Sequence, residues 1–328
     1  MKTVLDIKKL SIDIHTGLGS VKAVRNVDLD LKVGEILSIV GESGCGKTIL
    51  CRSIQGILPK TAQIMNGNID IKTSSKEKNK FKDISMIFQN PMTALNPTMK
   101  IGEQIAEGIR YKEKISKKEA KKEAIRYLEL VGIDHPTQRY NSMPHEFSGG
   151  MRQRIVIAIA LATKPQILIA DEPTTSLDVT IQKQILNLIL KLKDELLFSV
   201  IFVTHDLSIV ASISDRVAVM YAGKIVEIGT TEDIFFDCRH PYTKALLESL
   251  PSEGADVELV SIDGAPPSLI NLEVGDSFAR RNENALKIDY LKEPPMFKIS
   301  ETHSAATWKL HEFYKKQSDE VVEAINNG

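Results

Sequence analysis

The sequence contains little cysteine: Cys45, Cys51 and Cys238 lie far apart and form no C-x-x-C pair. This excludes a disulfide framework and the usual zinc motifs, and it is typical of a protein in a reducing compartment. No apolar run approaches the roughly eighteen residues of a membrane-spanning helix. The amino-terminal "MKTVLDIKKLSIDIH" alternates polar and apolar residues and lacks the apolar core of a signal peptide. We therefore expect any membrane contact to go through a partner.

A strong excess of charge is also absent, since the formal net charge is -1 in 328 residues. A general nucleic-acid binder usually carries a clear positive excess. The lysine-rich stretch "KKEAKKEAIRYLEL" (117–130) favours a solvated helix face with charge pairs four residues apart over a nucleic-acid patch. We predict no nucleic-acid partner.

Apolar runs of strand length alternate with longer amphipathic runs, which predicts an α/β fold with a mainly parallel sheet covered on both faces. The expected strands are 3–14, 20–32, 35–40, 166–173 and 199–206, and the expected helices are 48–58, 103–132, 151–162 and 180–195. Beyond Pro251 the chain has two Pro-Pro pairs, few apolar runs and a short expected helix at 310–325. We therefore divide the chain into a domain of residues 1–250 and a small extension of residues 251–328.

A glycine-rich stretch between an expected strand and an expected helix reads "GESGCGKT" (41–48) and fits G-x-x-x-x-G-K-[ST]. Its glycines let the backbone curl so that N–H groups face phosphates. Lys47 is expected to reach the β and γ phosphates, and the Thr48 hydroxyl is expected to ligate Mg²⁺. The predicted nucleotide-binding residues are Gly41, Glu42, Ser43, Gly44, Cys45, Gly46, Lys47 and Thr48.

Acidic and polar side chains follow other expected strands. Asp171 and Glu172 end "ILIADEP"; Asp171 is expected to hold Mg²⁺, and Glu172 to accept a proton from an attacking water. His205 follows "VIFVT" and is expected to lie at the same sheet edge and to hydrogen-bond the γ phosphate. Gln89 follows "MIF" and is expected to sense both Mg²⁺ and the water. The predicted catalytic residues are Glu172, His205 and Gln89, and the predicted Mg²⁺ ligands are Thr48, Gln89 and Asp171.

Six motifs occur in the order "GESGCGKT", "FQNP", "FSGGMRQR", "ILIADEP", "TTSLD" and "VTHD". This order resembles the ATP-binding cassette subunit of ABC transporters over about residues 3–250. The resemblance implies a P-loop ATPase with a RecA-like parallel core, an antiparallel β subdomain and a helical subdomain at about 92–160. It also implies that ATP and Mg²⁺ are the cofactors, and that Ser176, Leu177 and Asp178 form the D-loop.

A second anion site is expected at "FSGGMRQR", where a serine and two glycines precede a helix. In the family that the chain resembles, two cassettes stack head to tail and the signature of one clamps the γ phosphate bound by the other. The resemblance therefore implies that Ser148, Gly149, Gly150 and Gln153 act on a partner's ATP, and that one cassette alone hydrolyses poorly.

The first strand region departs from the family, which usually stacks an aromatic side chain from it on adenine. The stretch "SIDIHTGLGSVKAV" contains neither tyrosine nor phenylalanine. Ile14 or His15 is the nearest substitute, so base binding is expected to rely on apolar contact.

The stretches "DEPTTSLDVTIQKQIL", "HPYTKALLESLP" and "GAPPSL" are similar to the subfamily of oligopeptide, dipeptide and nickel importers. This implies a second, different cassette, two membrane permeases, an external binding protein and a peripheral place on the cytoplasmic face of the membrane. Peptides are expected as cargo, with nickel or a metal chelate as the alternative. A soluble cassette acting on nucleic acid or ribosomes is a remote alternative, because the chain has one cassette and no heptad run. A binding-only cassette is disfavoured by Glu172 and His205.

The extension of that subfamily commonly carries four cysteines that hold an iron–sulfur cluster. Here the frame "GDSFARRN", "ALKID" and "HSAAT" is kept, but the cysteine positions are occupied by Asp276, Asn282, Asp289 and Thr307. Fe–S clusters need thiolates, whereas these are oxygen ligands. We predict that the extension folds without a cluster. We expect these four side chains to be solvated surface groups, with oxygen ligands for another metal as the alternative.

Overall fold

A computed structural model of the chain describes residues 2–73, 80–175, 177–249 and 262–314. The central element in the described ranges is an eight-stranded sheet in the order β10-β11-β9-β8-β3-β7-β6-β5. Five neighbours, β8, β3, β7, β6 and β5, run parallel, and β9, β11 and β10 continue the sheet in antiparallel pairing. The strands are β3 (Ile36–Val40), β5 (Ile84–Ile87), β6 (Ile167–Asp171), β7 (Ser199–Thr204), β8 (Arg216–Tyr221), β9 (Lys224–Thr230), β10 (Phe297–Lys298) and β11 (Ser304–Ala305).

A second, antiparallel sheet in the order β2-β1-β4 packs over the first. Its strands are β1 (Thr3–Thr16), β2 (Gly19–Lys32) and β4 (Ala62–Ile71). A turn at residues 17–18 joins β1 and β2, which match the strands expected at 3–14 and 20–32, so both are confirmed. Together the two sheets confirm the α/β fold with a parallel core and an antiparallel β subdomain.

Strand side chains alternate between two cores. In β6 and β7, Leu168 and Phe202 face one cluster with the helices, whereas Ile169 and Ile201 face the other with β1, β2 and α1 (Lys47–Gln55). A strand buried on both faces reads as a continuous apolar run, which explains the sequences of β3, β6 and β7. These core strands hold their carboxyl ends at one edge of the sheet.

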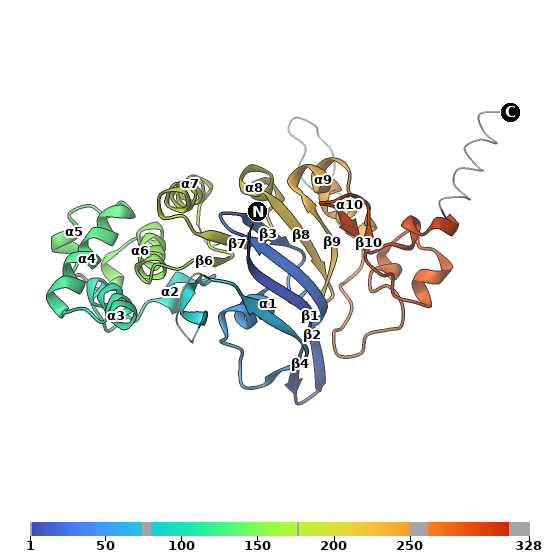
Figure 1. The fold of residues 1–328 in the computed structure, drawn as a ribbon, viewed down its shortest axis with the longest axis horizontal. Coiled ribbons are helices and arrows are strands. Elements are labelled where there is room, and N and C mark those ends of the chain that lie inside the picture. The colour runs from blue at the N-terminus through green and yellow to red at the C-terminus, as the bar shows by residue number, and fades with distance from the viewer. Residues whose placement is uncertain (1, 74–79, 176, 250–261, 315–328) are drawn as a thin grey trace.

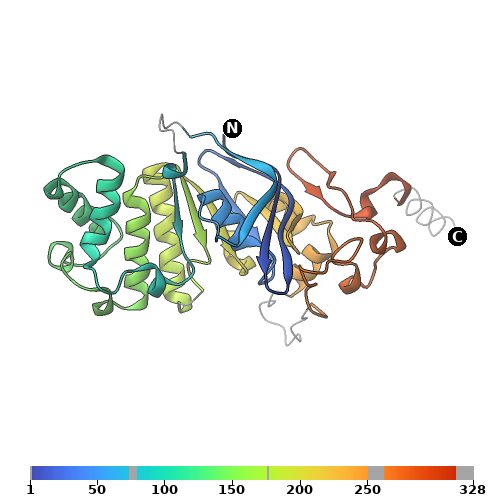
Figure 2. The same cartoon turned by 90° about the horizontal axis from the view of Figure 1, so that it is seen from below.

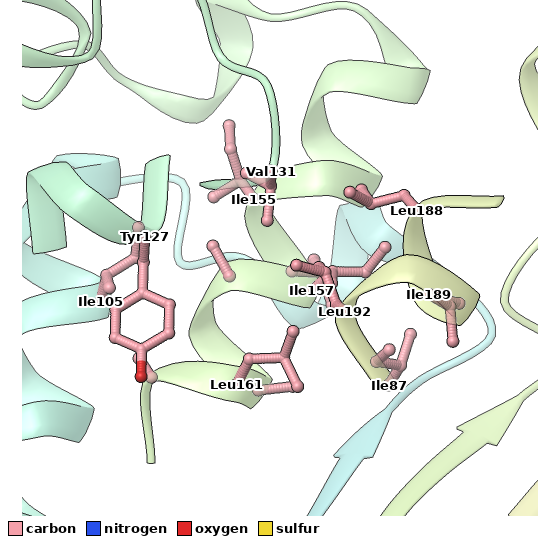
Figure 3. Packing of buried hydrophobic residues seen from close by; sticks show 14 of the residues in the cluster. Ile87, Ile105, Tyr127, Val131, Ile155, Ile157, Leu161, Leu188, Ile189 and Leu192 are labelled. Carbon is pink, nitrogen blue, oxygen red and sulfur yellow. The ribbon is translucent and has the colours of Figure 1, made fainter. Parts of the chain in front are cut away.

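Residues 91–162 form a block of helices at one end of the molecule (Figure 1). The block contains α2 (Pro91–Ala94), α3 (Ile101–Glu113), α4 (Lys117–Leu130), α5 (Pro136–Arg139), the 3₁₀ turn η2 (Pro144–Glu146) and α6 (Gly149–Ala162). From Ile155 to Ala162, helix α6 is apolar all round because it packs against α3, α4 and α7 (Val179–Leu196), as Figure 3 shows for Ile155, Ile157 and Leu161.

The helix expected at 103–132 is divided into α3 and α4. Lys114 ends α3 in the left-handed conformation with φ 54°. Ser116 then starts α4 with a capping box, in which its side chain bonds the Glu119 N–H and the Glu119 side chain bonds the Ser116 N–H. Between Ile109 and Ala120 the chain carries only Tyr111 and Ile115 as apolar residues, so the apolar period is interrupted where the helix breaks.

The described part of the extension, residues 262–314, packs at the opposite end of the molecule (Figures 1 and 2). It contributes β10, β11 and the 3₁₀ turns η3 (Ala279–Arg281), η4 (Lys287–Tyr290) and η5 (Trp308–Leu310), while residues 312–314 begin a helix and the rest of the helix expected at 310–325 lies outside the described residues. Its Phe278 joins a core with α8 (Leu207–Ile213), α9 (Thr231–Phe236) and α10 (Pro241–Glu248). Within the ranges described, no helix combines the length and apolarity needed to cross a membrane.

Candidate functional site

The loop after β3 is held by close backbone contacts. A Cβ atom on Gly41 would lie 2.0 Å from the Met220 carbonyl oxygen, and one on Gly46 would lie 2.2 Å from that of Ala23. Both glycines also have positive φ, 152° and 108°. The loop therefore fits between β2 and β8 only because these positions carry no side chain.

The loop ends at the first residue of α1, where Lys47 is buried. Its Nζ donates to the carbonyl oxygens of Gly41 and Glu42 over 2.6 and 2.8 Å. The N-cap of α1 is Gly46, with no side-chain cap and no acidic residue in the first turn. By contrast, serine, aspartate and threonine side chains cap α4, α6, α7, α8 and α9. The uncapped N–H groups and the positive end of the helix dipole suit a phosphate.

The residues that end β5, β6 and β7 meet beside this loop. Thr48 Oγ1 lies 3.5 Å from Asp171 Oδ1. Gln89 Nε2 donates to Glu172 Oε2 over 2.8 Å, and His205 Nδ1 lies 3.5 Å from Glu172 Oε1. The structure thus brings together all five side chains that the sequence assigns to catalysis and Mg²⁺ binding.

Glu172 has an unusual backbone conformation for a non-glycine residue, with φ 47°. Its N–H donates to the Val203 carbonyl oxygen, and the Thr175 hydroxyl donates to its carboxylate over 2.9 Å. Left-handed backbone at such a residue costs free energy and persists where the surroundings enforce it. The conformation turns the Glu172 carboxylate towards Gln89 and His205.

Burial raises the pKa of the Asp171 carboxyl, and the nearby Glu172 charge adds to this rise, whereas the hydrogen bond from Thr48 opposes it. Two adjacent carboxyls in a half-buried site form a place where a cation would be stabilised. The hydroxyl and carboxylate oxygens of Thr48 and Asp171 are the ligand types that Mg²⁺ prefers. The residues present therefore fit this metal.

A pocket of about 220 Å³ joins these residues to apolar side chains. It is lined by the loop with Lys47 and Thr48, by Gln89 and Glu172, and by the aliphatic side chains of Ile14, Val21, Ala23 and Leu269. A larger cavity of about 760 Å³ lies between α10 and the extension, but neither Lys47 nor Glu172 lines it. The smaller pocket is therefore the candidate nucleotide site, because it is lined by the phosphate loop and the catalytic side chains.

The signature residues lie elsewhere. Ser148 is exposed and caps α6 by accepting the Met151 N–H, and Gly149 is exposed beside it. Gly150 approaches α7, since an added Cβ would lie 2.7 Å from Ile181 Cγ2. None of these three residues lines the 220 Å³ pocket. The signature and the phosphate loop of one chain therefore do not share a pocket in the described part of the structure.

The fourth signature residue, Gln153, and the D-loop of residues 176–178 remain to be placed. The Gln153 side chain is 1% exposed, so it faces the protein interior. In the D-loop, Asp178 caps α7 through the Ile181 N–H, and Leu177 Cδ2 would lie 3.9 Å from a Cβ on Gly149. Ser176 lies outside the described residues.

The four residues at the cysteine positions of the extension are not solvated surface groups, so that expectation is wrong. Asp289 and Thr307 are each 4% exposed, and Asp276 and Asn282 are half-buried. Each accepts a backbone N–H: from Phe278, Asn284, Leu286 and Lys309 for Asp276, Asn282, Asp289 and Thr307, respectively. Burial raises the pKa of Asp276 to about 6. Among the residues that the structure describes, no group of three or more His, Cys, Asp and Glu side chains is placed to hold a metal ion.

The extension reaches the phosphate loop through Arg281, a contact that the sequence analysis missed. Arg281 donates from both terminal nitrogens to the Glu42 carboxylate, over 2.7 and 2.9 Å. It also donates to the Tyr221 hydroxyl, and the hydrogen bonds to Glu42 raise the pKa of its guanidinium. The Glu42 N–H also donates to the hydroxyl oxygen of Tyr242 in α10 over 2.9 Å. Glu42 and Arg281 are 239 residues apart, so no local pattern links them.

The fold and site together define a P-loop nucleotide-hydrolysing cassette. A sequence profile described as "ABC transporter" matches residues 24–175, and one described as "Oligopeptide/dipeptide transporter, C-terminal region" matches residues 226–288. The chain belongs to the ABC transporter family, in the branch whose members carry this C-terminal region, and it is an ATPase of that family.

Close relatives cover nearly the whole chain. The oligopeptide transport ATP-binding protein OppD of Bacillus subtilis (strain 168) is 52% identical over 98% of this chain and 93% of its own length. The dipeptide transport ATP-binding protein DppD of Lactococcus lactis subsp. cremoris (strain MG1363) is 50% identical over 94% and 91%. Among solved structures, the ATP-binding cassette MJ0796, in a dimeric post-hydrolysis state bound to ADP and Pi, is 28% identical with a TM-score of 0.59. That match covers 69% of this chain and 98% of the cassette.

Replacing Arg281 by methionine is expected to lower the free energy of unfolding by about 2 kcal/mol, because it removes the cation that pairs with a partly buried carboxylate. It is also expected to weaken ATP binding, because Glu42 belongs to the phosphate loop. Arg280→Met is the matched control, since Arg280 is exposed and pairs only with Glu273 at the surface. Urea unfolding and ATP titration of both variants measure the difference. Equal effects of the two substitutions would contradict a coupling between the extension and the loop.

Proposed function

We propose that the chain hydrolyses ATP to energise the import of oligopeptides or dipeptides. The observation that carries the proposal is the meeting of Glu172 with Gln89, His205, Asp171 and Thr48 beside a phosphate loop. The peptide cargo is supported by the names of relatives about 50% identical over most of the chain. Those names do not favour the nickel alternative, and the family membership does not favour a soluble cassette acting on nucleic acid.

In this proposal the side chains divide the work by position. Lys47 and the N–H groups at the start of α1 bind the β and γ phosphates. Thr48 and Asp171, with Gln89, would hold Mg²⁺, which neutralises charge on the phosphate oxygens when bound. Glu172 accepts the proton of the attacking water, since Gln89 and Thr175 fix its carboxylate and leave His205 beside it. His205 is exposed enough to meet the γ phosphate.

A second cassette is part of the proposal. Ser148, Gly149 and Gly150 start α6 at the surface and do not line the pocket with Lys47. An anion site that is separate from its own chain's phosphate loop suits a phosphate held by a neighbour. The dimeric state of the related cassette MJ0796 supports this arrangement. Because Gln153 is buried, the proposal keeps only the three signature residues that approach the surface.

Permease subunits are the other proposed partners. A groove of about 440 Å³ between α1, β5 and the helical block is lined by apolar side chains that include Ile57, Met86, Phe88 and Tyr111. Phe88 directly precedes Gln89, which donates a hydrogen bond to Glu172. A partner that moves Phe88 would therefore also move the group that positions the catalytic carboxylate. An apolar exposed groove of this kind suits a protein element. We propose that permeases dock here and hold the chain on the cytoplasmic face of the membrane, with an external binding protein delivering the cargo.

Glu172→Gln is expected to keep ATP binding and to slow hydrolysis in the assembled transporter by about a hundredfold or more, because the amide cannot accept the proton. Glu129→Gln, on the exposed face of α4, is the control for loss of one carboxylate. ATP titration and phosphate release separate binding from turnover. Normal turnover in the Glu172 variant would refute the proposed mechanism.

Ser148→Arg is expected to reduce hydrolysis at the partner's ATP by about a hundredfold while ATP binding at Lys47 stays unchanged. The substitution also removes a helix cap, which costs about 1 kcal/mol. Ser116→Arg removes the equivalent cap from α4 and is therefore the matched control. Hydrolysis is measured in the assembled pair. If both variants hydrolyse ATP equally well, the signature does not act on a neighbour.

We also propose that the extension folds without an iron–sulfur cluster, because each of the four side chains at the cysteine positions accepts a backbone N–H. Protein purified under anaerobic conditions is expected to contain no stoichiometric iron or sulfide. Metal analysis and the visible absorption spectrum test this. A broad visible band with iron and sulfide in stoichiometric amounts would overturn it.

A further inference from the structure

The pocket beside the phosphate loop is lined by two chemically different groups of residues. Gln89 and Glu172, which follow β5 and β6, mark where the γ phosphate must lie, because hydrolysis takes place there. Ile14, Val21, Ala23 and Leu269 are all aliphatic and come from β1, β2 and the extension; we call these four residues the apolar end of the pocket. Ile14 and Val21 face each other as a cross-strand pair of β1 and β2. The apolar end offers the base and ribose of ATP an apolar contact when the γ phosphate lies beside Glu172.

Leu269 belongs to the extension, although the other residues of this apolar end come from β1 and β2. Figures 1 and 2 both show the extension beside the β1–β2 hairpin, on the side away from the helical block. The Lys22 N–H donates to the Leu269 carbonyl oxygen over 2.9 Å. Ile270 Cγ2 approaches within 3.1 Å of the place where Gly19 would carry a Cβ atom. Leu269 is therefore fixed against β2 by its backbone and by its neighbour.

The start of the same segment is anchored to the phosphate loop. Arg281 donates to the carbonyl oxygens of Ile262 and Asp263 over 3.2 and 2.8 Å, in addition to its two bonds to Glu42. Residues 262–270 are thus held at one end by the arginine that bonds the loop and at the other end by β2. This arrangement sets the distance between Leu269 and the loop that binds the phosphates.

We propose that Leu269 contacts the adenine base of ATP, so that the extension completes the base-binding surface of the nucleotide site. This inference rests on the proposed ATPase function and goes beyond it by assigning a residue of the extension to ATP binding. Aliphatic side chains give a base apolar contact but cannot read the hydrogen-bonding groups on its edge. The site therefore gains affinity from the base and discriminates weakly between purines.

The test compares ATP with inorganic tripolyphosphate, which carries the phosphates but no base. Leu269→Ala in the full-length chain is expected to weaken Mg²⁺–ATP binding by about tenfold, the effect of losing most of one buried leucine contact. Binding of Mg²⁺–tripolyphosphate is expected to remain unchanged. Leu269→Met, which keeps the apolar bulk, is expected to restore ATP affinity. Ile270→Ala is the matched control, because Ile270 is the half-buried neighbour that packs on Gly19 instead of lining the pocket.

Calorimetric titration of the wild-type chain and the three variants gives these affinities, and thermal unfolding shows whether each variant is folded. A parallel loss of ATP and tripolyphosphate binding in Leu269→Ala would overturn the proposal, since Leu269 would then only support the loop. Unchanged ATP binding would overturn it as well. Failure of the wild-type chain to bind ATP would instead refute the ATPase function itself, so the two failures are distinguishable.

Discussion

The nucleotide site depends on one steric constraint: the phosphate loop lies so close to the backbone of two strands that no side chain fits between them. Gly41 meets the Met220 carbonyl of β8, and Gly46 meets the Ala23 carbonyl of β2. The Gly223 N–H adds a bond to the Cys45 carbonyl oxygen. Because both strands support the loop, the parallel sheet and the antiparallel sheet must pack in one fixed relation. Lys47, Thr48 and the start of α1 take their positions from that relation.

The same constraint links the loop to the extension. The β8–β9 hairpin that contacts the loop also carries Glu227, whose buried carboxylate accepts the Arg239 and His240 N–H groups and contacts His303 Nε2 over 2.8 Å. Arg25 of β2 reaches Ser277 and Glu293 of the extension. Arg281 of the extension adds two hydrogen bonds to the Glu42 carboxylate of the phosphate loop. The extension thus packs against β2, the β8–β9 hairpin and the phosphate loop, which explains how a segment far along the chain lies beside the nucleotide pocket.

Sequence reasoning recovers the catalytic end of the site because its signals are local. Parallel strands β5, β6 and β7 end at one edge, so Gln89, Asp171 and His205 meet once their strands are recognised. It does not recover the apolar end. Leu269 lines the pocket, and Arg281 bonds Glu42 of the phosphate loop. Both contacts join residues that lie hundreds of positions apart in the chain, which no period or motif encodes.

Two other differences have equally physical causes. The break between α3 and α4 depends on one left-handed residue, Lys114, and on a capping box, and it lies in a lysine-rich stretch whose residues are all compatible with a helix. Asp276 and Asp289 look like surface groups in sequence, because acidic residues usually are. Here their carboxylates accept backbone N–H groups that have no main-chain acceptor within the described ranges, and the tight turns that contain these groups are packed into the protein.

If the phosphate loop and the extension form one nucleotide site, bound ATP must slow amide hydrogen exchange in both segments. Exchange is measured in the full-length chain with and without Mg²⁺–ATP. We expect slower exchange in residues 41–48 and, to a comparable degree, in residues 262–281 when ATP is bound. Slower exchange confined to residues 41–48 and the ends of β5, β6 and β7, with the extension unaffected, would contradict it.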